Sequence, residues 1–282
     1  MHAFVLALLF LAVREPHLPD PGQLAVPVRS DPQGLLRVNT DFYRMSAETG
    51  GDFYFWAPGE FASAHLQIPL PGDHVAFAYG TLSPQGWRIS IPVESGARRL
   101  SVFAGMQRKD FAVLRRPDGH VVSGTAAGES LQSFRYMIIA QIDSPRPGTW
   151  QLELHGAGLV SVSAEVAPGR DPDAPTFLGL RYVEMGGRPG HQGWFPIDRE
   201  PAKGETLECS ASLPGKSTSV AFRFVAADGE IVGRPMLAQV EVGGDFYGRC
   251  QVPAVPYRVM VTARDSAGQP FQRIEPGLRT PR

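Results

Sequence analysis

The sequence lacks the features that would place it in several large protein classes. Its 27 Lys and Arg residues are balanced by 28 Asp and Glu residues, so it has no surplus of positive charge for binding the phosphates of a nucleic acid. The main apolar run, Ala3–Val13, is shorter than the roughly 20 residues that a membrane-spanning helix needs. We therefore expect neither a nucleic-acid partner nor a transmembrane segment.

Sequence motifs of the common enzyme and cofactor sites are also absent. The chain contains no G-x-S-x-G, G-x-x-x-x-G-K-[ST], H-E-x-x-H or EF-hand pattern. Its 7 histidines are scattered, and only His65 and His74, which flank a Pro-Gly turn, form a candidate metal pair. The sequence predicts no catalytic residue, no cofactor and no metal. An unrecognised hydrolase or a hydrolase accessory protein is the alternative.

Cysteine is scarce, and the two that occur bear on the cellular compartment. Ala3–Val13 has the length of the apolar core of a signal peptide, so we expect residues 1–13 to direct secretion to an extracellular or periplasmic location. A buried strand is the alternative. In an exported β protein, Cys209 and Cys250 are expected to form a disulfide rather than two buried free thiols.

Turn-forming residues are abundant, with 31 Gly and 26 Pro. Between the turns lie short segments in which apolar and polar residues alternate, as in strands buried on one face. No crossover helices separate these strands, so a β-sandwich is favoured over a parallel sheet. In a first series we predict strands at 75–82, 87–93, 100–104, 111–115, 134–142, 150–154 and 160–166.

The polar segment Pro168–Pro175, stiffened by prolines, is the best domain boundary. The strands predicted beyond it have the rhythm of an immunoglobulin-like (Ig-like) domain. They lie at 177–183, 206–213, 220–226, 236–242 and 257–264. The predicted fold class is therefore all-β, with two consecutive β-sandwich domains over 75–168 and 175–282. Cys250 precedes the strand that would be F, so the disulfide is not the usual inter-sheet bridge of Ig domains.

Two further predictions concern the segments around these domains. Residues 14–74 comprise a linker rich in Pro, Gly and Asp, then a helix over Thr40–Glu48 and an aromatic strand over Asp52–Trp56. At the domain boundary, Asp171 and Asp173 together with Asp143 offer oxygen ligands for Ca²⁺, but a solvated acidic linker is the favoured explanation.

An ordered set of short motifs runs from Arg88 to Pro276. They are Ile91-Pro-Val-Glu-Ser95 with Leu100-Ser-Val102, Leu114-Arg-Arg-Pro-Asp-Gly119, Pro147-Gly-Thr-Trp150, and Val261-Thr-Ala-Arg-Asp265 with Phe271-Gln-Arg273. The set resembles the C-terminal modules of the hemicentin and von Willebrand factor A domain-containing protein group. Ala47–Phe55 is similar to the closing helix-strand corner of a von Willebrand A domain, but the D-x-S-x-S metal loop is absent. The resemblance implies a galactose-binding-like sandwich, then an Ig-like domain, with an extracellular adhesion role and no enzyme activity.

Aromatic residues near predicted turns are the main functional candidates, because a flat ring beside polar groups can stack on a sugar. A basic patch that suits acidic glycans is formed by two arginine pairs on neighbouring predicted strands, Arg98-Arg99 and Arg115-Arg116. The predicted ligand-binding residues are Trp87, Trp194, Phe195, Phe246, Tyr247, Arg115 and Arg116. The alternative is that the rings close the ends of the sandwiches and the arginines lie on a solvated face.

These residues favour a binding or adhesion module whose sandwich-end loops contact a glycan, a matrix polymer or a protein surface. A structural subunit that self-associates through Ig-like edge strands is the alternative.

Overall fold

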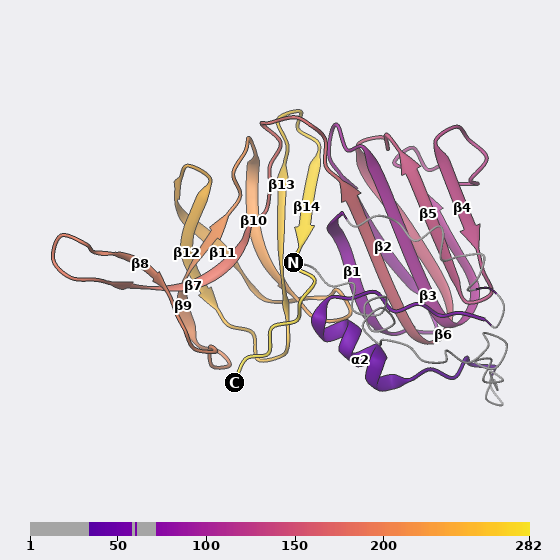
Figure 1. The fold of residues 1–282 in the computed structure, drawn as a ribbon, viewed down its shortest axis with the longest axis horizontal. Helices are drawn as coiled ribbons and strands as arrows, with labels where there is room; N and C mark the ends of the chain where they lie inside the picture. The colour runs from indigo at the N-terminus through magenta and orange to yellow at the C-terminus, as the bar shows by residue number, and fades with distance from the viewer. Residues whose placement is uncertain (1–33, 58–59, 61–71) are drawn as a thin grey trace, which may run out of the picture.

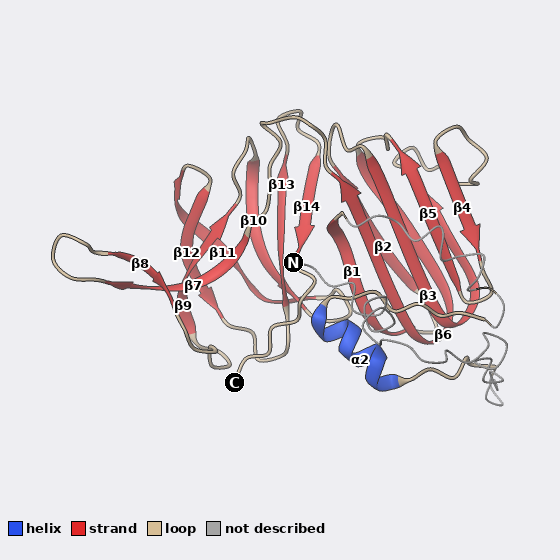
Figure 2. Ribbon diagram, in the orientation of Figure 1, coloured by secondary structure: helices blue, strands red, loops and turns tan. Residues whose placement is uncertain are grey.

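The computed structural model describes residues 34–57, 60 and 72–282, which form two β-sandwich domains and one short helix (Figure 1 and Figure 2). The all-β fold class is thereby confirmed. The predicted signal peptide 1–13, the linker 14–32 and His65 lie outside the described residues. Within the described ranges, no helix has the length and apolar character needed to cross a membrane.

Helix α2 (Thr40–Thr49) confirms the predicted helix, and both of its ends are capped. The side chain of Asn39 accepts hydrogen bonds from the backbone N–H groups of Asp41 and Phe42, at 3.0 and 3.2 Å. At the other end Gly50 has φ 82°, the left-handed conformation that favours glycine. A Cβ at Gly50 would also lie 2.6 Å from Pro276, so the C-terminal segment can approach the helix only at a glycine.

The predicted strand over Asp52–Trp56 is wrong, because this segment joins no sheet. It crosses the outer face of the N-terminal sheet, where Ser161 Oγ donates to the carbonyl of Phe53 at 2.8 Å. We call residues 51–57 the strap. Its four consecutive rings project alternately to two sides, as in a strand, although the backbone pairs with no sheet. The rings of Phe53 and Phe55 contact Tyr43 of α2, and those of Tyr54 and Trp56 contact Phe103 and Phe134.

In the N-terminal domain the strand order is β1-β6-β3-β5-β4, with β2 also paired to β6. The strands are β1 (Asp73–Thr81), β2 (Trp87–Val93), β3 (Arg99–Arg115), β4 (Glu129–Ser133), β5 (Met137–Asp143) and β6 (Gly148–Ala167). Strand β1 pairs with the second half of β6 and β2 with the first half. One apolar core contains residues from both halves, such as Trp150 and Val162, so the sheet folds over onto itself.

Strands β3 and β6 are longer than the sequence predicts. The segments 100–104 and 111–115 belong to one strand, as do 150–154 and 160–166. Their pairing contains two register shifts, one between Met106 and Arg108 and one between Lys109 and Phe111. β-Bulges of this kind bend a strand without ending it. Gly156 lies in this region because a Cβ there would come within 1.9 Å of the carbonyl oxygen of Arg108.

The C-terminal domain has the two-sheet arrangement of an Ig-like domain. Its strand order is β14-β13-β10-β11-β12-β9-β7-β8, and β11 runs from one sheet into the other. The strands are β7 (Gly179–Gly186), β8 (Gly193–Pro196), β9 (Thr206–Ser212), β10 (Thr218–Val225), β11 (Ile231–Val242), β12 (Asp245–Gln251), β13 (Arg258–Arg264) and β14 (Pro270–Ile274). Of these, β8, β12 and β14 are missing from the sequence prediction.

The predicted disulfide is present and joins two neighbouring strands of one sheet. Cys209 on β9 is bonded to Cys250 on β12, and both cysteines are buried in the core of this domain. The bond therefore ties β9 to β12 rather than linking the two sheets, as the position of Cys250 predicts.

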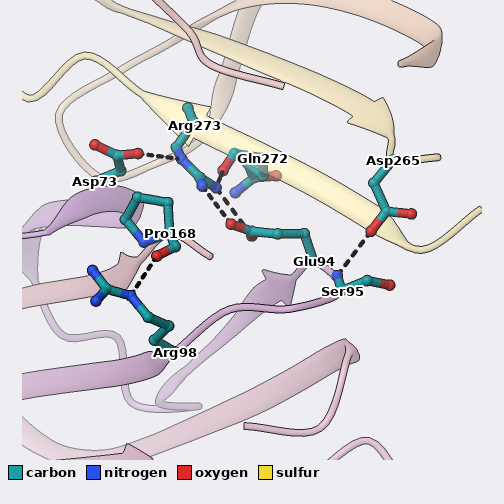
Figure 3. A network of polar contacts seen from close by, with 8 residues as sticks. All are labelled: Asp73, Glu94, Ser95, Arg98, Pro168, Asp265, Gln272 and Arg273. Carbon is teal, nitrogen blue, oxygen red and sulfur yellow. Dashed lines mark hydrogen bonds and ion pairs between the residues drawn. The ribbon is translucent and has the colours of Figure 1, made fainter. Parts of the chain in front are cut away.

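A network of ion pairs and hydrogen bonds joins the two domains (Figure 3). The buried guanidinium of Arg273 on β14 contacts Glu94 at 2.5 Å and Asp73 at 3.1 Å, both carboxylates belonging to the N-terminal domain. Gln272 donates to the carbonyl of Val75 at 2.6 Å, and Asp265 accepts from the N–H of Ser95 at 2.8 Å. The partners face each other across the boundary, so the network fixes one domain against the other.

A shared apolar cluster strengthens this boundary. Tyr43 of α2, Phe55 of the strap and Tyr79 of β1 pack in one cluster with Val225 and Ile274 of the Ig-like domain. The helix and the strap therefore belong to the interface between the domains.

Candidate binding surface

The β7–β8 hairpin extends away from the body of the Ig-like domain, at the left of Figure 1. Strand β8 ends the sheet order, so β7 is its one partner strand in the described part of the chain. Met185, Trp194 and Phe195 of this hairpin are among the most exposed large apolar side chains, at 61%, 40% and 47%.

The strand register shows which side chains share the outer face of this sheet. Arg181 on β7 pairs with Ser210 on β9, which pairs with Tyr247 on β12, while Met185 pairs with Trp194. Because side chains alternate along a strand, Arg181 and Met185 lie on the same face as Tyr247 and Trp194. We call these four residues the hairpin face.

The two rings of the hairpin face lie against each other. Trp194 and Tyr247 have ring centroids 6.2 Å apart, with their planes at 27°. Beneath this region Val183 is only 5% exposed, although it lies outside the apolar core cluster. Because Val183 lies on the outer face of the sheet, neighbouring side chains of that face cover it.

Some of the charged side chains near the hairpin face form ion pairs and others do not. Arg249 Nε lies 2.5 Å from Glu208 Oε1. Arg199 forms two hydrogen bonds with Glu205, which lower the pKa of Glu205 to about 2. Arg181 is exposed and makes no hydrogen bond or ion pair with any described residue. The face thus presents two aromatic rings and one arginine without an ion pair, and Asp245, two residues from Tyr247 on the same side of β12, adds a negative charge to it.

The other predicted ligand residues lie away from this face. Phe195 is on the hairpin, but it pairs with Glu184 and therefore projects on the opposite side. Phe246 packs with its ring 5.6 Å from Phe222 in the core of the Ig-like domain. Trp87 packs against the core of the N-terminal domain. The structure thus brings together Trp194 and Tyr247, and separates Trp87 and Phe246 from them.

The predicted arginine patch is occupied by carboxylates of its own domain. Arg115 lies 3.7 Å from Glu153, and Arg116 forms an ion pair with Glu129. The acidic linker is similarly engaged, since Lys216 lies 2.6 Å from Asp173. Over the described ranges, no three His, Cys, Asp or Glu side chains come together in a way that could hold a metal.

A buried polar cluster under the strap escaped the sequence analysis. Tyr54 donates to Asp52 at 3.2 Å, and the N–H of Gly72 donates to Glu165 at 2.6 Å. The ring of His74 approaches both Glu165 and Ser163. Burial raises the pKa of Asp52 and raises that of Glu165 to about 7. The negative charge of Asp52 also raises the pKa of Glu165, and both carboxylates raise the pKa of Tyr54. The alternation of Ser161, Ser163 and Glu165 along β6 is the sequence signal for this polar face.

The cluster does not have the geometry of a Ser-His-acid triad. In such a triad one ring nitrogen contacts the serine and the other contacts the acid. Here Nδ1 of His74 lies 3.3 Å from Ser163 Oγ and 3.6 Å from Glu165 Oε1, so the same nitrogen faces both. Ser163 is also buried, which leaves the hairpin face as the best candidate for contact with a ligand.

Comparison with known proteins identifies no family. No protein-family model and no curated protein matches the chain. The lipase BlEst2 of Bacillus licheniformis in its propeptide form is 12% identical, with a TM-score of 0.24, over 77% of this chain and 48% of the lipase chain. The Ig1-2 module of the Drosophila receptor protein tyrosine phosphatase DLAR is 14% identical, with a TM-score of 0.24, over 66% of this chain and 94% of that module.

The titin domains Z1Z2, from their complex with telethonin, are 14% identical, with a TM-score of 0.23, over 76% of this chain and 98% of titin Z1Z2. This chain spans about half of the lipase chain that it matches. Likenesses with TM-scores this low carry no argument about function, so the function has to be inferred from the residues of the surface itself.

Proposed function

We propose that the protein is a secreted, non-catalytic binding or adhesion module that contacts its partner through the hairpin face. The observation that carries the proposal is the stacked pair formed by Trp194, which is 40% exposed, and the half-buried Tyr247 on the outer face of a sheet. Amphipathic rings of this kind contact sugars, polymers and protein surfaces at little entropic cost. The Cys209–Cys250 disulfide supports secretion, because such bonds persist in oxidising compartments.

The rigidity of the sheet beneath the rings supports the same proposal. Tyr247 lies on β12, which the disulfide ties to β9, and β9 pairs with β7 of the hairpin. A surface held in its binding conformation loses less entropy when it binds. The resemblance to the hemicentin and von Willebrand factor A domain-containing group points to the same adhesive role.

Retention of the full chain on immobilised glycans, matrix polymers and matrix proteins tests this function. We expect the wild-type protein to be retained on at least one surface, and Trp194→Ala and Tyr247→Ala to lose at least about tenfold in affinity. Phe42→Ala, which removes an exposed ring from α2, is the matched control and should bind like the wild type. Equal retention of Trp194→Ala and Phe42→Ala on every surface would refute the proposal.

Self-association through an edge strand is the second candidate. Strand β8 has one neighbouring strand in the described structure, and an open edge of this kind can pair with a second chain. Light scattering over a wide concentration range tests it. A mass of one chain at every concentration would rule out assembly, whereas a concentration-dependent dimer would favour it.

A further inference from the structure

We propose that a hollow in the Ig-like domain binds a single neutral sugar ring. The hollow lies where β10 and β12 begin, and its volume is about 210 Å³. Pockets for drug-sized ligands measure roughly 300–1,000 Å³, so this one suits a free monosaccharide or the end residue of a glycan. It does not include the hairpin face, and the inference therefore goes beyond the proposed function.

The hollow and the hairpin face lie on opposite sides of β12. Phe246 lines the hollow, and its neighbour Tyr247 belongs to the hairpin face. Because successive side chains of a strand project to opposite faces, Phe246 points between the two sheets of the domain while Tyr247 points outward. The contact of Phe246 with the buried Phe222 agrees with this direction. A change at Trp194 therefore leaves the hollow intact.

Three consecutive residues with hydroxyl groups, Ser217, Thr218 and Ser219, border the hollow. In a regular strand successive residues face opposite sides, so three in a row would not share one site. Here the pairing of β10 with β13 shifts its register between Thr218 and Ala221. Ser219 also has φ 57°, the left-handed conformation that glycine adopts more readily. Bulges redirect side chains in this way and are common beside functional sites.

The lining joins these hydroxyls to an apolar wall. Val220 and the half-buried Phe246 form the apolar part, and none of the lining side chains in the described chain carries a charge. The hydroxyls of Ser217, Thr218 and Ser219 form no hydrogen bond with a residue that the structure describes. A sugar has the same two properties, since its C–H groups pack on apolar side chains and its hydroxyls donate and accept hydrogen bonds.

The charged side chains around the hollow are engaged with other groups or face elsewhere. Lys216 lies 2.6 Å from Asp173, and Asp171 also acts on its charge. Arg264, opposite the start of β10, donates at 2.8 Å to a backbone carbonyl of the turn after β13. Asp245 projects to the outer face of its strand, with the hairpin face. We therefore expect a neutral ligand to be preferred to a charged one.

The turns that enclose the hollow are packed tightly. A Cβ at Gly244 would lie 2.7 Å from Cα of Pro214, and one at Gly215 would lie 2.6 Å from the carbonyl oxygen of Ala174. The N–H of Leu213 donates to the carbonyl of Gly244 at 2.7 Å. The walls are therefore fixed before a ligand arrives, which reduces the entropy lost on binding.

Titration of the full chain with neutral methyl glycosides tests the inference. Methyl glucoside, galactoside and mannoside would be compared with methyl glucuronide by saturation-transfer NMR. We expect at least one neutral glycoside to bind with a dissociation constant on the order of 1 mM, which is ordinary for so small a ligand. The glucuronide should bind more weakly, because its carboxylate would lose water without gaining a counter-charge. Added salt should leave the affinity of the neutral glycoside unchanged.

Ser219→Gly is the decisive variant, because it removes a hydroxyl while glycine accepts φ 57° without strain. The free energy of unfolding should not fall, whereas the affinity for the glycoside should fall at least about threefold with the lost hydrogen bond. Phe246→Leu, which keeps an apolar side chain against the core, should also weaken binding. Ser144→Gly is the matched control, since Ser144 is an exposed serine of the N-terminal domain with φ 48°, and it should bind like the wild type.

A trisaccharide of the sugar that binds identifies the source of the ligand. Binding of both compounds supports the inference with the end residue of a glycan as the ligand. Binding of the methyl glycoside alone supports it with a free monosaccharide.

Four results would overturn the inference. They are no binding of any neutral glycoside, equal affinities of Ser219→Gly and Ser144→Gly, tighter binding of the glucuronide than of every neutral glycoside, and loss of glycoside binding in Trp194→Ala but not in Phe246→Leu. The last result would place the sugar on the hairpin face and support the proposed function instead. The proposed function fails separately if Trp194→Ala and Phe42→Ala are indistinguishable on all surfaces.

Discussion

Glu165 lies under the strap with its carboxyl enclosed on several sides. It accepts from the N–H of Gly72 on one side and faces His74 on another. Asp52 of the strap and Asp73 of β1 add negative charge nearby, which raises the pKa of Glu165. The charge of Glu165 in turn raises the pKa of Tyr54 in the strap. Its burial and these acidic neighbours make Glu165 the residue whose protonation should be most visible in the stability of the fold.

The free energy of unfolding should fall as the pH rises from about 4.5 to about 7. Burial raises the pKa of Glu165 from 4.5 to about 7, so between these values the unfolded chain loses the proton and the folded chain keeps it. The stabilisation is complete below about pH 4.5 and has been lost above about pH 7, a difference of about 3 kcal/mol. Glu165→Gln retains an acceptor for Gly72 and should remove most of this dependence.

Urea unfolding at about pH 5 and about pH 8 measures the effect. Glu200→Gln, which alters an exposed carboxyl, is the control and should show the same pH dependence as the wild type. Some dependence should remain in Glu165→Gln, because burial also raises the pKa of Asp52. Parallel pH profiles for the wild type and Glu165→Gln would contradict the prediction.

At the scale of single residues, the sequence identifies the aromatic residues near turns but not which of them are exposed and which are packed in a core. Trp194 and Phe246 both follow turn signals, yet one is exposed on the hairpin and the other packs on Phe222. Which face a residue takes depends on strand register, and a shift of one residue exchanges the faces. The burial of Asp52 could not be predicted for another reason. It depends on β6, which is remote in sequence.

At the scale of elements, alternation predicts where strands lie better than where they end. The segments 111–115 and 150–154 are correctly assigned to strands, but each continues through a bulge into a neighbouring segment. A bulge and a turn use the same residue types, so the local sequence does not distinguish them. Strand β8 has only 4 residues and little alternation, which explains why the hairpin itself could not be predicted.

The contact between β14 and the end of β2 depends on one buried ion pair. Arg273→Met would leave the carboxylate of Glu94 buried without its counter-charge, and we expect a loss of about 3–5 kcal/mol in the free energy of unfolding. The double variant Glu94→Met with Arg273→Met should lose less than the single one, because the only carboxylate left without Arg273 is then Asp73, which is half-exposed. Urea unfolding of the three proteins gives both values.

The matched control is Arg88→Met, which removes an arginine from an exposed ion pair with Glu153. Surface pairs of this kind contribute about 1 kcal/mol or less. If Arg273→Met were no more destabilising than Arg88→Met, the buried network would not be the main polar connection between the domains.

At the scale of the molecule, the helix, the strap and both sandwiches meet around Arg258. This fully buried arginine of β13 donates to the carbonyls of Ala47 in α2 and, at 2.8 Å, of Pro276 near the C-terminus. Its guanidinium lies 4.8 Å from the ring centroid of Phe77 on β1. Burial lowers its pKa to about 10, so it remains charged at neutral pH. One side chain thus connects the Ig-like domain to two elements of the N-terminal half.

Because of these connections, the two domains should unfold together. Calorimetry of the wild-type chain should show one transition, with equal calorimetric and van't Hoff enthalpies. Arg258→Met keeps most of the apolar stem but removes the hydrogen bonds, and it should divide the transition into two or make the calorimetric enthalpy exceed the van't Hoff value. Arg264→Met, at the exposed end of the same strand, should keep the single transition. Two transitions in the wild type, or one unchanged transition in Arg258→Met, would show that the domains are energetically independent and that the hairpin face is carried by the Ig-like domain alone.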